Sequence, residues 1–304
     1  MKFIYITDVH LKGKNPSSRI DVYIDSAFNK LNEVYTVAKD SQLDFVLIGG
    51  DLFDTSQVAL SVIDRLCDLI EHYNIKTYVL WGNHDENNCN KGGTALEHCF
   101  NRCKLIEALT LIEDDKFILQ GIEYTISIDQ DLKDSGYVFN SDKFKILAPH
   151  ANITPSKCVD GFSHVIAKEL KTDADLVLVS HYHSNHGIKK INNVEFAWVG
   201  ALTRGTIGVG DINRIPSYLI FDNGKSEIIE LKCALPANDV FDLDKVAAIK
   251  ATKNDLNGFI ASLKESRVNS FKFIDRLNYY CDENKVDKSI KDVIINNMII
   301  SEDE

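Results

Sequence analysis

The segment "GNHDENN", residues 82–88, directly follows the apolar run "KTYVLW". An amide, an imidazole and two carboxylates therefore come at the point where the chain leaves its core. Such a stretch is either a polar turn, in which Asn and Asp bond their own backbone, or a set of ligands for a metal ion. The rest of the chain has to decide between the two.

Four other apolar runs end in the same way. The polar residues are Asp8 and His10 after "YIT", Asp51 and Asp54 after "VLIGG", Asn83, His84 and Asp85 after "YVLWG", His150 after "ILAP", and His181 and His183 after "VLVS". One Asp or His at a strand end is commonly a turn residue, but five in succession need another explanation. Carboxylate and amide oxygens with neutral imidazoles suit Mn, Fe or Zn, and two cations about 3.5–4 Å apart need an anionic bridge, which one Asp can supply.

These side chains depend on strands that bring them together. The apolar runs 2–7, 45–50, 77–81, 144–150 and 174–181 predict buried strands. Helical spacing of apolar residues predicts helices over 21–39 and 61–73 between them, and a further helix is expected at 162–170. The turns "NNV" and "DNG" predict hairpins. Ligands of α/β sheets bind outside the carboxyl ends of the strands, so we expect the polar residues to converge there.

Composition limits the class of protein. The chain has 304 residues, 44% hydrophobic and 26% charged, as is ordinary for a globular protein. The first apolar run is interrupted by Asp8 and His10, and no stretch reaches the roughly 18 apolar residues of a membrane span. We therefore expect a cytoplasmic protein without a membrane segment.

The seven cysteines form no CxxC pair, which argues against a disulfide framework or a thiolate zinc site.

The net charge of −11 argues against nonspecific nucleic-acid binding over the whole surface. It leaves a nucleic-acid enzyme possible, because bound cations can supply the positive charge that phosphates need.

Beyond Pro236 the chain becomes rich in Lys, Asp and Asn with helical periodicity. We therefore expect a catalytic domain over 1–235 and a helical region over 236–304, which either caps the catalytic domain or presents an apolar face to a partner.

The order D-x-H, GD-x-x-D, GNHD, a single His after a strand and H-x-H resembles the calcineurin-like metallophosphoesterase superfamily over about residues 1–231. The resemblance implies an α/β fold, a four-layer α-β-β-α sandwich. It also implies two divalent metal ions. Their ligands would be Asp8, His10 and His183 for one ion, Asn83, His150 and His181 for the other, and Asp51 as the bridge.

The same resemblance leaves His84 free to act on the substrate, as an acid or as a stabiliser of developing charge. Asp54 would orient His10 or His84. Asp85 would either accept a hydrogen bond from an imidazole or cap its own loop. Water activated by the two cations would attack phosphorus in line.

Within the superfamily, "IGGDLFDT", "VLWGNHD" and the stretches 200–204 and 214–216 resemble the DNA-repair exonuclease branch, the SbcD-like nuclease subunits. That branch implies a DNA exonuclease and endonuclease of repair or recombination that prefers manganese, with Fe, Zn or Mg as other possibilities. It further implies a homodimer and an SbcC-like coiled-coil ATPase as partner. Arg204, Arg19 or nearby lysines would contact the phosphate backbone.

Two other interpretations remain open. A metallophosphatase or cyclic-nucleotide phosphodiesterase acting on small molecules or phosphoproteins would use the same centre with a closed pocket. A metal-bearing scaffold could retain the fold to bind a partner, but a scaffold has no need of His84.

Overall fold

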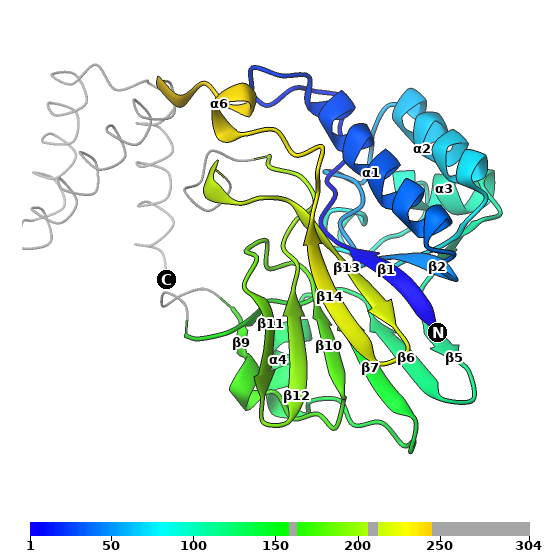
Figure 1. Ribbon diagram of the computed structural model, residues 1–304, viewed down its shortest axis with the longest axis vertical. Helices are drawn as coiled ribbons and strands as arrows, with labels where there is room; N and C mark the ends of the chain where they lie inside the picture. The colour runs from blue at the N-terminus through cyan, green and yellow to red at the C-terminus, as the bar shows by residue number, and fades with distance from the viewer. Residues whose placement is uncertain (158–162, 206–211, 245–304) are drawn as a thin grey trace, which may run out of the picture. The chain divides into compact units, whose positions relative to one another are not determined.

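Two six-stranded sheets lie face to face in the computed structural model, which describes residues 1–157, 163–205 and 212–244 (Figure 1). The first sheet has the order β14-β13-β1-β2-β3-β4, and the second has the order β11-β12-β10-β7-β6-β5. The bounds in the first sheet are β1 (Lys2–Ile6), β2 (Phe45–Ile48), β3 (Lys76–Val79), β4 (Ile106–Ala108), β13 (Ser217–Asp222) and β14 (Lys225–Glu230).

The second sheet carries the later half of the predicted site. Its strands are β5 (Leu111–Glu113), β6 (Phe117–Ile122), β7 (Phe144–Pro149), β10 (Leu176–Val179), β11 (Gly187–Ile191) and β12 (Val194–Trp198). Strands β1 to β4 run parallel to one another, as do β6, β7, β10 and β12, whereas β5, β11, β13 and β14 pair antiparallel with their neighbours.

Helices cover the outer faces of both sheets. On the first sheet these are α1 (Tyr23–Asp40), α2 (Leu60–Tyr73) and α3 (Ala95–Arg102) (Figure 1). The second sheet is covered by α4 (Ile128–Asp134) and by the short pair β8 (Ile153–Thr154) and β9 (Val165–Ile166). The predicted four-layer α-β-β-α sandwich is therefore confirmed.

Strand alternation produces these layers. In β1, Ile4 and Ile6 point to the helices, whereas Phe3 and Tyr5 point into the core between the sheets. Successive side chains of a strand face opposite sides, so a strand covered on both faces must be apolar throughout. That requirement explains the uninterrupted apolar runs that precede the polar residues.

One of the predicted helices is wrong. Helices α1 and α2 confirm the predictions over 21–39 and 61–73, but the segment predicted as a helix over 162–170 contains β9 and a single 3-10 turn, Ala167–Glu169. The β-branched pair Val165 and Ile166 extends alongside β8 instead, which is the conformation such residues favour. Only three residues remain for the turn that follows.

The two predicted hairpins are confirmed. Asn192 and Asn193, between β11 and β12, have φ of 50° and 69°, and Asn223 and Gly224, between β13 and β14, have φ of 49° and 94°. Positive φ at both central residues gives the turn the twist of its flanking strands.

The compact unit ends at Leu243, past the boundary predicted at residue 235. The short helix α6 (Ala237–Val240) belongs to it, since Ile20 N–H donates to Val240 O at 3.0 Å. Most of the predicted helical region 236–304 lies outside the described residues, so its capping or partner-binding role stays a prediction. In the described ranges, no helix has the length and apolar character needed to cross a membrane, and the cysteines described there are free.

Candidate metal centre

The predicted ligands come together at the carboxyl ends of strands from both sheets. Loops after β1, β2 and β3 of the first sheet carry Asp8, His10, Asp51 and Asn83, and loops after β7 and β10 of the second carry His150, His181 and His183. Two clusters result, and within each the ligand atoms lie within 4.8 Å of one another. The first contains Asp8, His10, Asp51 and His183, the second Asp51, His150 and His181.

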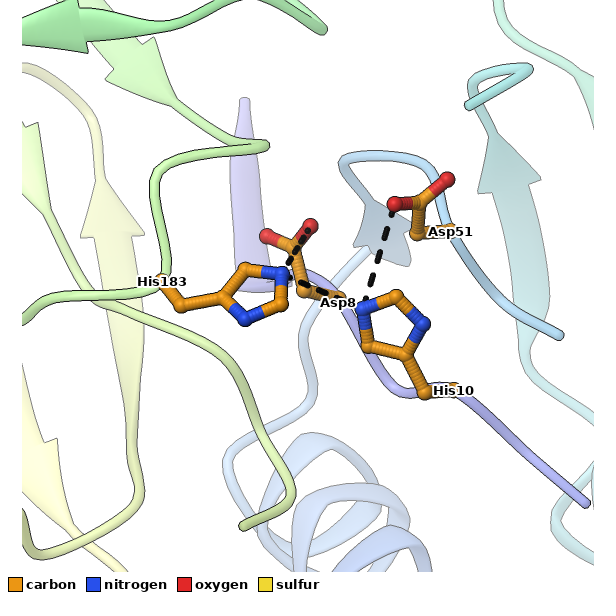
Figure 2. Close-up of side chains that lie close together, drawn as sticks. All are labelled: Asp8, His10, Asp51 and His183. Carbon is orange, nitrogen blue, oxygen red and sulfur yellow. Dashed lines mark hydrogen bonds and ion pairs between the residues drawn. The ribbon is translucent and has the colours of Figure 1, made fainter. Parts of the chain in front are cut away.

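The first cluster surrounds a point between three loops (Figure 2). His183 Nε2 lies 3.5 Å from Asp8 Oδ1 and 3.2 Å from His10 Nε2, and His10 Nε2 lies 3.8 Å from Asp51 Oδ2. Two imidazole nitrogens and two carboxylate oxygens thus face one another. This is a donor set for a borderline divalent cation.

The second cluster uses the other oxygen of Asp51. Asp51 Oδ1 lies 3.5 Å from His150 Nε2, and Asn83 Oδ1 lies 3.3 Å from the same nitrogen. The rings of His150 and His181 are 5.0 Å apart between centroids. His150 Nδ1–H donates to Gly49 O at 2.7 Å, which leaves Nε2 unprotonated in the neutral ring and available to a metal.

Buried oxygens without donors indicate that a cation fits here. Asp8 Oδ2 accepts hydrogen bonds from Thr7 Oγ1 at 2.8 Å and His181 N at 3.2 Å, and Asp51 Oδ1 accepts one from His84 N at 2.9 Å. Asp8 Oδ1 and Asp51 Oδ2 have no hydrogen-bond donor among the described residues, although the two residues are 0% and 1% exposed. A buried carboxylate oxygen without a partner is costly. Bound cations would satisfy both, so the residues fit a binuclear metal centre.

The protonation states suit this purpose. Burial alone would raise the pKa of both carboxyl groups, but nearby imidazoles outweigh it; they lower the pKa of Asp51 to about 2 and place that of Asp8 well below its usual range. Burial lowers the pKa of His10 to about 4, so its ring is neutral. Burial also acts to lower the pKa of His150, but Asp51 and Asp8 raise it to about 9. A cation that binds His150 near neutral pH would therefore displace a proton.

Four of the cluster residues have left-handed backbones. Asp8, His10, Asp51 and His181 have φ of 51°, 50°, 50° and 65°. This conformation costs an L-residue about 1–2 kcal/mol. Hydrogen bonds between the loops hold it, since Asp8 N–H donates to Gly50 O at 3.1 Å and His10 N–H to Asp51 O at 3.0 Å.

Two glycines allow the loops to approach the ligands. A Cβ on Gly82 would lie 2.1 Å from Asp51 Oδ1, and one on Gly50, whose φ is +102°, would lie 2.2 Å from His150 Nδ1. No real Cβ approaches a neighbour so closely, so both positions require glycine. The "GG" before Asp51 and the Gly of "GNHD" are thus part of the site's geometry.

His84 lies beside the first cluster and is exposed. Its ring meets that of His10 edge-on, with centroids 4.8 Å apart, and its Nδ1–H donates to the backbone carbonyl of Asp54 at 2.6 Å. Asp54 therefore contacts His84, one of its two predicted partners, through the main chain. Its carboxylate instead pairs with Lys12 at 2.9 Å and lies 3.9 Å from His10 Nδ1.

Asp85 caps the metal-binding loops, which is the second of the two roles predicted for it. Its buried carboxylate accepts backbone N–H groups from Phe53 at 2.9 Å, Gly82 at 3.1 Å and Leu52 at 3.3 Å. Burial and the nearby Asp51 raise its pKa to about 7, against the effect of these donors. The loop that carries Asn83 is thereby tied to the loop that carries Asp51.

The arginines predicted to meet phosphate are buried. Arg204 is 3% exposed and donates to Leu235 O at 2.5 Å, and Arg19 is 7% exposed and donates to Asp21 Oδ2 at 2.5 Å. Both guanidinium groups fasten loops in this structure. A substrate contact by Arg204 stays a prediction.

Of two further residues beside the clusters, Tyr124 did not emerge from the sequence, and Lys12 emerged only among the lysines near Arg19 that were expected to contact phosphate. Lys12 lines the cavity over the first cluster, and the ring of Tyr124 lies 5.8 Å from that of His181 and 6.2 Å from that of His150. Tyr124 follows β6, which runs parallel to β7, so a sixth strand end reaches this edge. The signal was that strand, but the three residues directly after it, Glu123, Tyr124 and Thr125, include no Asp, Asn or His.

Comparisons with known proteins identify one family. The family model described as "Calcineurin-like phosphoesterase" matches residues 1–185. A solved structure of TT1561 of Thermus thermophilus is 11% identical, with 75% of this chain and 98% of that one covered and a TM-score of 0.45. A structure of Yfce, a phosphoesterase from E. coli, is 14% identical, with 77% and 96% covered and a TM-score of 0.40. The comparison with curated proteins found no match.

Replacing Asp51 with asparagine should remove metal. Asp51→Asn keeps the shape but deletes the charge shared by both clusters, so we expect at least one of two manganese ions to be lost on dialysis, measured by elemental analysis. Asp44→Asn is the matched control. Asp44 accepts a hydrogen bond from Lys2 N at the start of β1 and β2, at the opposite end of these strands from the clusters. Two ions retained in Asp51→Asn would contradict the bridging role.

Replacing Asp85 should loosen the centre without touching a ligand. In Asp85→Asn the amide NH₂ group would face backbone N–H donors, so we expect a loss of about 1–3 kcal/mol in the free energy of unfolding and weaker manganese binding by calorimetry. Asp114→Asn is the control, since Asp114 caps Lys116 N and Phe117 N away from the site. Equal manganese affinity in Asp85→Asn and the parent protein would disprove the loop-tying role.

Proposed function

We propose that this chain, which belongs to the calcineurin-like phosphoesterase family and is a metal-dependent phosphoesterase, hydrolyses phosphodiester bonds of DNA in the manner of the SbcD-like nucleases. Manganese is the metal that we propose for the centre. The observation that supports a polymeric substrate most directly is the opening of the centre to the surface.

The cavity over the first cluster is small and open. It has a volume of about 190 Å³ and is lined by His10, Lys12, Asp54, His84, His183, Thr203 and Gly205. His84 is exposed, and the side chain of His183 is 42% exposed. Sites for small molecules bury most of their ligand, about 70–90% of its surface. This cavity has room for the reacting phosphate and leaves the rest of the ester outside, as a long strand requires.

The side chains have separate tasks at the phosphate. Two bound divalent cations would lower the pKa of water and offset the phosphate charge. Because the Asp54 carbonyl holds His84 Nδ1–H, Nε2 is the ring atom left to face the leaving oxygen, and the imidazolium form of the ring would donate its Nε2 proton there. The Lys12 ammonium also lies at this cavity, where it pairs with the Asp54 carboxylate at 2.9 Å.

A phosphatase acting on small esters is the second candidate. The net charge of −11 favours it, because a negatively charged protein surface repels a long polyanion more than a small ester. The two candidates differ in what lies beyond the scissile bond, so a panel of substrates separates them.

The substrate panel compares DNA with small esters. Purified protein is incubated with end-labelled duplex DNA, single-stranded DNA, p-nitrophenyl phosphate and bis(p-nitrophenyl) phosphate, in Mn²⁺, Mg²⁺ or EDTA. We expect manganese-dependent cleavage of DNA and little turnover of the monoester. If the protein hydrolyses the monoester rapidly and leaves the DNA uncut, the phosphatase function is established instead.

Removing the His84 imidazole should separate catalysis from metal binding. In His84→Ala we expect activity to fall at least about 100-fold, the usual contribution of a positioned acid, while both manganese ions remain. His98→Ala, an exposed histidine on α3, is the control and should match the parent. Loss of metal from His84→Ala, measured by elemental analysis, would show that the ring is a ligand.

A further inference from the structure

An open groove continues from the metal centre along the protein surface. It has a volume of about 660 Å³ and shares Lys12 and Asp54 with the cavity over the first cluster. One wall is the loop that follows His10, and the other is the segment between Asp54 and α2. The groove therefore lies next to the catalytic cavity, and the Lys12–Asp54 ion pair lines both.

Hydrogen bonds fix both walls. Asn15 Nδ2–H donates to Asp21 O at 2.8 Å, and Asn15 Oδ1 accepts from Tyr23 N at 2.6 Å. On the other wall, Gln57 Nε2–H donates to Gly93 O at 2.8 Å, and Thr55 Oγ1 donates to Gln57 O at 2.7 Å. Walls that are held in this way lose little freedom when a ligand binds between them.

The charge of the groove is opposite to that of the protein. Asp54 is the carboxylate in its lining, and Lys12 neutralises it at 2.9 Å. Lys14 is exposed and has no ion-pair partner within residues 1–157, 163–205 and 212–244. A positive groove on a chain of net charge −11 is a local feature that suits an anionic ligand.

The groove also has apolar surface between its polar rims. Pro16, Val58 and Ala59 line it beside the lysines. A polynucleotide presents alternating phosphates and flat apolar faces of its bases, so lysines next to an apolar wall match its chemistry. A phosphate ester that consists of a single small group would leave most of this surface unused.

We propose that this groove binds the nucleotides next to the scissile phosphate, with a backbone phosphate at Lys14 and a sugar or base against Pro16, Val58 and Ala59. This inference rests on the proposed nuclease function and names where its substrate strand runs. Lys12 joins the two parts, because it faces both the catalytic cavity and the groove.

The test uses Lys14→Ala and two substrates. The ratio of kcat/KM for a 12-nucleotide single strand to kcat/KM for bis(p-nitrophenyl) phosphate is measured, because the small ester reaches only the metal centre. We expect this ratio to fall at least about 5-fold in Lys14→Ala. The slope of log(kcat/KM) against log(salt concentration) for the oligonucleotide should also become shallower by about 0.7, the value of one lost phosphate contact on a single strand.

Lys225→Ala, an exposed lysine at the β13–β14 hairpin, is the matched control and should leave both quantities as in the parent. If Lys14→Ala cleaves the oligonucleotide efficiently, with the same kcat/KM ratio and the same salt slope as the parent protein, the groove assignment is overturned and the proposed function remains intact. If the parent protein turns over the small ester and leaves the oligonucleotide uncut, the proposed nuclease function fails and this inference fails with it.

Discussion

The need to compensate two buried carboxylates governs this structure. The side chains of Asp8 and Asp51 are almost completely buried. In each carboxylate one oxygen accepts hydrogen bonds from the protein, and the other oxygen faces imidazole rings. A folded chain tolerates such an arrangement only when positive charge is at hand. The strand ends, the left-handed backbones and the close glycines all serve to bring these groups and the imidazoles to one place.

The surrounding loops hold the ligand atoms of each cluster within 4.8 Å of one another, although the strand ends that carry them are far apart in sequence. Asp85 joins the loops of Asp51 and Asn83 through three backbone donors, and the Asp54 carbonyl holds His84. Ligands that are themselves oriented by backbone groups need not reorganise when a metal or substrate arrives. The loop that carries Asp51 continues into one wall of the groove that contains Lys14, so a substrate strand bound there would lie against the same loop as the metal ligands.

Much of the site could be predicted from the sequence because its residues follow apolar runs that can only be buried strands. Asp8, His10, Asp51, Asn83, His150, His181 and His183 are brought together as the strand ends indicated. Their division between two sheets could not be predicted, since apolar runs do not state which strands pair. The burial of Arg204 was missed for a similar reason: its partner, Leu235 O, is 31 positions away and is a backbone atom that any residue could supply. Tyr124 was missed because an aromatic residue after a strand carries no metal-binding signal.

Each cluster takes its members from both sheets, and this arrangement has a consequence for the whole sandwich. An ion held by His10 and His183 would be a noncovalent crosslink between positions 173 apart in the chain. Crosslinks that close long loops restrict the unfolded ensemble most strongly. The ions would thus fasten one layer of the sandwich to the other, so amide exchange in the strands on both sides of this seam should respond to a chelator as one unit.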